Sequence, residues 1–222
     1  MLRRALKQAV TSCLPSRWVL YRVPRAGNKV ALTFDDGPNP EYTARVSRLL
    51  REQGARATFF LVGERMRRYP DLVARLLADG HELGNHSMTH AEFARLGYRE
   101  IVAETEEPWA LADAHGRRWF ANRYFRPPKG VLNAKVLAHC VRRGRRIVLW
   151  SADPKDYRAA SACEVLAYFD AHPVRPGDIV LLHDKTAATV EALPELLSRL
   201  KVDGLVPVTL SALLGVSGEA EA

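Results

Sequence analysis

The sequence alternates short apolar runs with longer amphipathic segments, and this alternation limits the possible folds more than any other feature. Seven runs have the composition and length of strands: 29–34, 57–62, 81–85, 123–125, 147–151, 178–183 and 205–209. Six segments between them have the length and periodicity of helices: 42–53, 70–79, 98–114, 134–143, 161–171 and 186–201. We expect Pro108 to kink or divide the third helix. Strands that alternate with helices predict an α/β fold with a parallel sheet covered by helices.

A sheet of about seven parallel strands is either a barrel or an open, doubly wound sheet. Hydrophobic periodicity does not choose between the two. In both, ligands bind at the carboxyl ends of the strands. The polar clusters described below each follow a strand, so we expect them to meet on one surface of the molecule.

The composition is typical of a soluble globular protein, with 47% hydrophobic and 26% charged residues among 222,. A chain of this length suits one domain. The formal net charge of +8 favours anionic partners, although a solvated basic surface accounts for it equally well,. We expect no nucleic-acid partner, because no nucleic-acid-binding motif accompanies the charge.

The sequence divides into an N-terminal arm at 1–28, a domain at 29–210 and a C-terminal tail at 211–222. The arm begins with basic residues, but Lys7, Gln8 and Thr11 interrupt the apolar stretch that a signal peptide needs,. No run approaches the roughly 18 apolar residues of a membrane span. We expect the arm to pack on its own domain, or to form an amphipathic helix that weakly contacts an anionic membrane surface. These features predict a cytoplasmic protein or one at the inner membrane face, without stable membrane insertion.

The three cysteines, Cys13, Cys140 and Cys163, are odd in number and widely spaced. Their spacing does not match a CxxC pair or a zinc ribbon. We interpret them as unpaired thiols, which are compatible with a reducing compartment.

Two motifs together predict a metal site. The motif TFDDGP places Asp35 and Asp36 at the end of a strand, where adjacent carboxylates are costly without a metal or a proton-transfer role,. The motif HSMTH places His86 and His90 at positions i and i+4, which share one face of a helical turn,. A plain turn and a surface histidine pair are the alternatives when each motif is taken alone. Two histidines and one of the two carboxylates form a three-ligand set that suits one divalent metal, with zinc favoured and cobalt or nickel compatible.

Three later clusters also follow predicted strands. In FRPPKG, Arg126 carries a permanent charge that can clamp a carboxylate,. In WSADPKDY, Asp153 and Asp156 offer two acids, one of which could pair with Arg126. In LLHD, His183 leaves a buried strand and could act as a general acid,. A surface arginine and a structural core histidine are the alternatives for these residues taken alone.

Taken together and in this order, the five clusters resemble the conserved blocks of the polysaccharide deacetylase family (NodB-like, carbohydrate esterase family 4). The resemblance runs from about Lys29 to Thr209. It implies a distorted (β/α) barrel of seven or eight strands. It also implies metal-dependent hydrolysis of an N-acetyl group on an amino-sugar substrate, which releases acetate and a free amine.

The resemblance also implies a role for each residue of the site. Asp35 is the catalytic base, Arg126 orients it, Asp156 braces Arg126, and His183 is the general acid. The metal ligands are Asp36, His86 and His90. The implied substrate-binding residues are Lys129, Tyr157, Leu181 and Pro128.

The sequence departs from the family pattern at two of these positions. Lys129 stands where the family usually has an aromatic residue whose backbone N–H helps to form the oxyanion hole, and Tyr157 stands where it usually has tryptophan. Both changes leave the identity of the sugar open. The basic chain and Lys129 fit an anionic substrate, such as a nucleotide-linked or lipid-phosphate-linked amino sugar. The alternative is that Lys129 points to solvent and contributes its backbone alone.

Two other functions remain compatible with these residues. One is a different amide or cyclic-imide hydrolase with the same metal site, because fold and ligands do not determine the substrate. The other is a non-catalytic carbohydrate- or partner-binding domain, although such a domain has no use for a base and an acid together.

Overall fold

A computed structural model describes residues 14–114 and 123–216 of the chain. The strands in these ranges are β1 (Val19–Leu20), β2 (Lys29–Asp35), β3 (Thr58–Leu61), β4 (Glu82–Asn85), β5 (Tyr124–Phe125), β6 (Arg146–Val148), β7 (Ile179–His183) and β8 (Val206–Val208). The α-helices are α2 (Thr43–Glu52), α3 (Gly63–Arg68), α4 (Pro70–Ala78), α5 (Tyr98–Ala114), α6 (Ala134–Arg142), α7 (Ala162–Ala171), α8 (Ala187–Val202) and α9 (Leu210–Leu213). Two 3₁₀ turns, η1 (Pro128–Gly130) and η2 (Asp156–Arg158), lie at the site described below.

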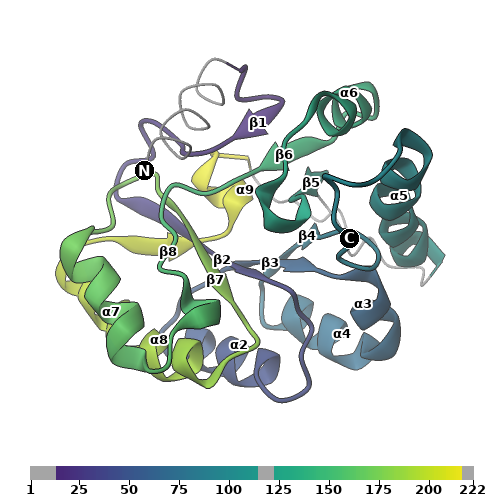
Figure 1. The fold of residues 1–222 in the computed structure, drawn as a ribbon. Coiled ribbons are helices and arrows are strands. Elements are labelled where there is room, and N and C mark those ends of the chain that lie inside the picture. The colour runs from purple at the N-terminus through teal and green to yellow at the C-terminus, as the bar shows by residue number, and fades with distance from the viewer. Residues whose placement is uncertain (1–13, 115–122, 217–222) are drawn as a thin grey trace.

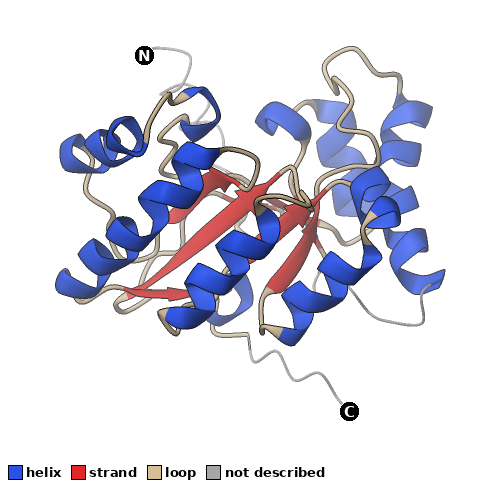
Figure 2. Cartoon of the chain, turned by 90° about the horizontal axis from the view of Figure 1, so that it is seen from below, coloured by secondary structure: helices blue, strands red, loops and turns tan. Residues whose placement is uncertain are grey.

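The strands pair in the order β1-β6-β5-β4-β3-β2-β7, with β8 beside the first half of β2, and every pairing is parallel (Figure 1). The regular strands do not close into a ring. The irregular chain after β6 nevertheless bridges to β7, where the Leu181 N–H donates to the Ala152 carbonyl at 2.9 Å. The fold is therefore a distorted α/β barrel with helices packed around its strands (Figure 2).

Side-chain alternation along β2 separates the helix-covered core from the barrel interior. Val30, Leu32 and Phe34 are buried in the main apolar cluster, which also contains residues of α2 and α8. Thr33 and Asp35 point the other way, toward the guanidinium of a buried arginine in the interior. Because successive side chains on a strand face opposite sides, this register aims a carboxylate into the barrel.

β7 repeats this alternation beside β2. Val180 and Leu182 belong to the helix-covered cluster, whereas Leu181 and His183 line an interior cavity. In the parallel register, His183 is the partner of Asp35. The last residues of two neighbouring strands thus present an acid and a histidine to the same space.

Segments on both sides of the expected domain at 29–210 pack against the sheet. In β1, Leu20 pairs with Val148 of β6 and is fully buried. In α9, Leu213 packs in the same cluster as Leu20, and the Leu210 N–H donates to the Thr58 hydroxyl at 2.9 Å. A two-residue strand and a four-residue helix are too short to show a periodic pattern.

Two other differences from the sequence prediction concern the helices. α5 runs through Pro108 without a break, and the short α3 was not predicted.

Cys140 is buried and Cys163 is exposed. Cys13 and the rest of 1–13, on which an amphipathic helix at a membrane surface was considered, lie outside the described residues. Within 14–114 and 123–216, no helix combines the length and apolarity that crossing a membrane requires.

The packing of the N-terminal segment on β7 can be tested at Gly177. The φ angle of Gly177 is +82°, and a Cβ there would lie 1.9 Å from the Val23 carbonyl oxygen. Gly204 has a similar φ of +71° but open space around it. We expect Gly204→Ala to lower the free energy of unfolding by about 1 kcal/mol through backbone strain. We expect Gly177→Ala to lower it by roughly 1–3 kcal/mol more, because Val23 must move. Urea unfolding measures both, and equal losses would contradict the packing.

Candidate active site

The two histidines of HSMTH converge through a loop after β4 and not through a helical turn. Ser87 and His90 both have left-handed backbone angles, with φ of 72° and 62°. Side chains hold this shape, because the Ser87 N–H donates to Asn85 Oδ1 at 2.8 Å and the His90 N–H donates to Ser87 Oγ at 3.0 Å. The expected i, i+4 geometry was therefore wrong, although the histidines do come together.

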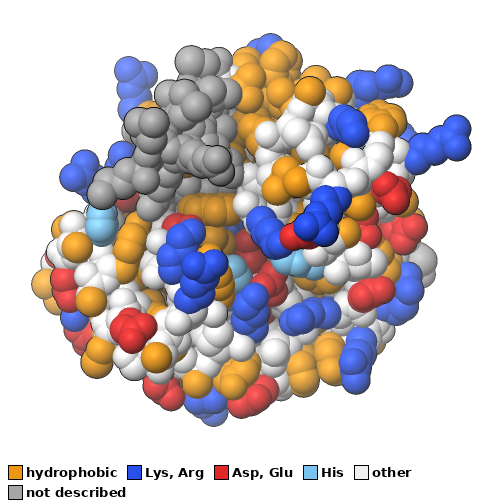
Figure 3. Space-filling model, in the orientation of Figure 1, with side chains coloured by type: hydrophobic (Ala, Val, Ile, Leu, Met, Phe, Trp, Pro, Cys, Tyr) orange, Lys and Arg blue, Asp and Glu red, His pale blue; other side chains and the backbone are white. Residues whose placement is uncertain are grey.

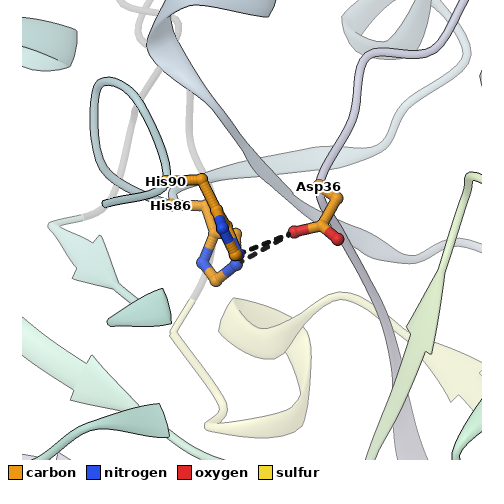
Figure 4. A group of neighbouring side chains, drawn as sticks. All are labelled: Asp36, His86 and His90. Carbon is orange, nitrogen blue, oxygen red and sulfur yellow. Dashed lines mark ion pairs between the residues drawn. The ribbon is translucent and has the colours of Figure 1, made fainter. Parts of the chain in front are cut away.

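His86, His90 and Asp36 form a compact cluster of three possible metal ligands (Figure 4). Asp36 Oδ1 lies 3.3 Å from His86 Nε2 and 3.2 Å from His90 Nε2. The three ligand atoms all lie within 4.8 Å of one another. Of the two carboxylates that the sequence left open as the metal ligand, Asp36 is the one that meets both histidines.

The chemistry of these three groups fits a divalent cation. The His86 Nδ1–H donates to the Arg126 carbonyl at 2.7 Å, so a neutral His86 turns the lone pair of Nε2 toward Asp36. Asp36 Oδ1 is buried and has no hydrogen-bond donor within the described ranges. The other oxygen, Asp36 Oδ2, forms an ion pair with Lys185, which favours the ionised carboxylate. An ionised oxygen and a lone pair that face each other without a proton are stabilised by a metal ion.

Asp35 is held on one side by a fully buried arginine. Arg126 Nη1 donates to Asp35 Oδ1 at 2.6 Å and to Thr33 Oγ1 at 2.9 Å. Its Nε and Nη2 atoms donate to the carbonyls of Val148 at 3.1 Å and Leu149 at 3.2 Å. Asp35 Oδ2 lies 3.7 Å from His86 Nε2, beside the three candidate metal ligands. One oxygen of Asp35 is thus anchored, and the other faces the site.

Asp156 contacts His183 and not Arg126, so the bracing role implied for Asp156 was wrong. The His183 Nδ1–H donates to Asp156 Oδ1 at 2.8 Å, and the His183 backbone N–H donates to Asp156 Oδ2 at 2.6 Å. The Thr189 hydroxyl completes the contacts of Asp156 Oδ2 at 2.7 Å. The other acid of the same segment, Asp153, is the one whose charge acts on Arg126.

His183 is tuned toward its protonated form. Burial lowers the pKa of His183, but the hydrogen bond and the charge of Asp156 outweigh burial. Asp35 and Asp36 add smaller effects in the same direction, and the pKa lies above its ordinary value. A histidine in this state can carry a proton near neutral pH.

These groups line one cavity of about 420 Å³. In Figure 3 the hollow shows acidic and histidine side chains in its floor and basic side chains around it. Three of the four expected substrate contacts, Lys129, Tyr157 and Leu181, line the cavity. Pro128 is buried and does not belong to its lining. The cavity is lined by Asp35, Asp36, His86, His90, Lys129, Trp150, Asp153, Lys155, Tyr157, Arg158, Leu181, His183 and Lys185.

Sequence reasoning missed two residues that follow His183 directly. Lys185 forms an ion pair with Asp36 Oδ2, the oxygen that faces away from the histidines. Asp184 is buried against Gly37 and accepts a hydrogen bond from the Thr43 hydroxyl. Burial raises the pKa of Asp184 to about 7. Their position at the carboxyl end of a buried strand was the signal that could have indicated them.

Comparison with known proteins agrees with this geometry. The family model described as polysaccharide deacetylase matches residues 22–148. A peptidoglycan-N-acetylglucosamine deacetylase of Bacillus cereus is 38% identical over 210 residues, which cover 90% of this chain and 94% of the relative. A chitooligosaccharide deacetylase of Sinorhizobium fredii is 39% identical over 173 residues, which cover 74% of this chain and 77% of the relative.

A solved structure extends the likeness to the fold. It is a crystal structure of a peptidoglycan N-acetylglucosamine deacetylase in complex with 4-naphthalen-1-yl-N-oxidanyl-benzamide. It matches with a TM-score of 0.82 and 30% identity, and the match covers 90% of this chain and 94% of that chain. The resemblance seen in the motifs is thereby confirmed: the chain belongs to the polysaccharide deacetylase family and is a hydrolase that acts on the N-acetyl amide bonds of sugars.

Proposed function

We propose that the protein removes an N-acetyl group from an amino-sugar substrate in a metal-dependent hydrolysis that releases acetate and a free amine. One observation carries the proposal. Three groups line the same cavity: the three candidate metal ligands, a carboxylate that a buried arginine anchors, and a histidine that a second carboxylate anchors. A hydrolase of amides needs a polarising group, a base and an acid at one place.

Asp36, His86 and His90 would hold one divalent cation. Two nitrogens and one oxygen suit zinc, and cobalt and nickel are compatible with the same set. When bound, the cation supplies Lewis-acid chemistry that polarises the acyl oxygen and makes water easier to deprotonate. Lys185, paired with the second oxygen of Asp36, keeps that oxygen turned away from the histidines.

Asp35 acts as the general base that takes a proton from the attacking water. The bond from Arg126 occupies Asp35 Oδ1 and leaves Oδ2 toward the cluster. Because Arg126 is fully buried, its hydrogen bonds hold Asp35 in one orientation,. The backbone N–H of Lys129, at the edge of the cavity, is proposed as a donor to the oxyanion that forms on the acyl oxygen,.

His183 acts as the general acid that protonates the departing amine. Asp156 occupies Nδ1 of the ring, so Nε2 is the nitrogen that delivers the proton. The same bond raises the pKa of His183, which keeps the acid loaded near neutral pH,. Asp156 is therefore a positioning residue for the acid.

Acetate release from N-acetylglucosamine oligomers tests the function as a whole. We expect the protein to release acetate, a chelator to abolish the release, and zinc, cobalt or nickel to restore it. Acetate quantification with and without chelator measures this. Release that is insensitive to the chelator would contradict the metal dependence. Absence of release from any metal-loaded sample would favour another amide substrate or a binding role.

The division of labour between the adjacent carboxylates predicts different losses. Asp35→Asn should still bind a stoichiometric divalent ion but turn over about 10²–10⁴-fold more slowly, because it lacks a base. Asp36→Asn should lose the ion together with activity. Metal analysis of the purified variants, with kcat measured in parallel, distinguishes the two. If Asp35→Asn lost the ion and Asp36→Asn kept it, the roles would be exchanged.

The contact between Asp156 and His183 predicts a change in pH dependence. The carboxylate of Asp156 favours the protonated ring, so Asp156→Asn should lower the pKa of His183,. The active form is the protonated one, so the basic limb of kcat/KM against pH should move to lower pH.

Asp153→Asn is the matched control, because it removes a negative charge from the same segment without touching His183. Its basic limb should stay in place. A shift in Asp153→Asn with none in Asp156→Asn would contradict the assignment.

A further inference from the structure

The charge of the cavity is not explained by the hydrolysis alone. Four cationic side chains, Lys129, Lys155, Arg158 and Lys185, belong to its lining. The three lysines form ion pairs with carboxylates: Lys129 with Glu92, Lys155 with Asp153, and Lys185 with Asp36. In the described part of the chain, Arg158 forms no such ion pair, and its side chain is exposed at the cavity.

Arg158 is also tied to the general acid through the short turn η2. Asp156 begins this turn and binds His183. The ring of Tyr157 packs edge-on against His183, with 5.0 Å between the ring centroids. The Arg158 guanidinium lies 5.3 Å from the centre of the Tyr157 ring. One aromatic ring therefore separates the Arg158 guanidinium from the group that protonates the leaving amine.

Lys155 adds a second cation to the same ring. Its ammonium lies 5.9 Å from the centre of Tyr157, and its backbone is left-handed with φ of 60°. The Lys155 N–H donates to Asp153 Oδ1 at 3.1 Å, which holds this conformation. Asp153 also accepts from Trp150 Nε1 at 3.1 Å. The lysine is thus kept at the cavity by a carboxylate whose charge is shared with other donors.

We propose that Arg158, assisted by Lys155, forms a subsite for an oxyanion, a carboxylate or a phosphate, on the substrate beside the sugar that loses its acetyl group. The subsite rests on the proposed function, because it is placed relative to His183 as the acid. A guanidinium offers two parallel N–H donors that match an oxyanion. An anion here would contact a guanidinium that has no carboxylate partner among the described residues, whereas Lys129, the cation that the sequence favoured for this role, pairs with Glu92.

The test compares three oligomers of equal length. One is a neutral N-acetylglucosamine oligomer, and the others carry a carboxylate or a phosphate on the neighbouring sugar. Wild type should bind and turn over at least one charged oligomer better than the neutral one. Arg158→Gln should reduce this preference in kcat/KM by about tenfold, mainly through KM, because a charge-assisted pair of hydrogen bonds is lost. The charged arm with the larger preference identifies the group.

Arg175→Gln is the matched control, because Arg175 is exposed outside the cavity and the substitution removes the same charge. It should keep the wild-type preference. Raising the salt concentration should reduce the preference in wild type more than in Arg158→Gln. An equal effect of Arg158→Gln on all three oligomers, or no effect on any, would overturn the subsite.

Equilibrium binding of the same oligomers separates this proposal from the proposed function. A preference of wild type for a charged oligomer that Arg158→Gln removes supports the subsite even without acetate release. In that case the hydrolysis alone would be wrong. Equal affinity of wild type for the neutral and both charged oligomers would overturn the subsite even if acetate is released.

Discussion

Arg126 is the residue on which the rest of the site depends, because it binds both the base and one of the candidate metal ligands. Its guanidinium binds Asp35 and the carbonyls at the end of β6, while its backbone carbonyl accepts the Nδ1 proton of His86. A buried charge is tolerated when it is paired and hydrogen-bonded, and losing one partner of a buried pair costs about 3–5 kcal/mol. The same residue therefore orients a carboxylate with its side chain and sets a histidine tautomer with its backbone.

The site also depends on the period-two alternation of two neighbouring strands. On β2 and β7, alternate residues fill the apolar core under the helices, and the intervening ones face the interior. This register brings Asp35 and His183 side by side at the strand ends. Each is then held by a partner from elsewhere in the chain, Arg126 for the base and Asp156 for the acid. The strand register brings the base and the acid close together, and the buried ion pairs hold each of them in one orientation.

Much of this arrangement could be predicted from the sequence, because it is encoded in strands and strand ends. The seven predicted strands are all present, and the residues expected at the metal site do converge. The alternation of side chains along each strand and the order of the motifs can both be read directly from the sequence. Hydrophobic periodicity could not choose between barrel and open sheet, because the choice depends on an irregular bridge between Ala152 and Val180. The family resemblance did imply the distorted barrel, and this prediction is confirmed.

What the sequence did not reveal are contacts set by irregular backbone. The approach of His86 to His90 needs two left-handed residues and side-chain hydrogen bonds within the loop. The partner of Asp156 depends on a single 3₁₀ turn, which no periodic pattern indicates. The pairing of Lys129 with Glu92, and the lack of an equivalent ion pair at Arg158 among the described residues, also require three-dimensional contacts.

A crystal structure of the protein loaded with zinc, with anomalous scattering recorded at the zinc edge, tests the central claim most directly. The account predicts one strong peak about 2 Å from Asp36 Oδ1, His86 Nε2 and His90 Nε2. Asp35 should remain bound to Arg126, and His183 to Asp156. A peak coordinated by Asp35 in place of Asp36, or one that lacks either histidine, would contradict the account.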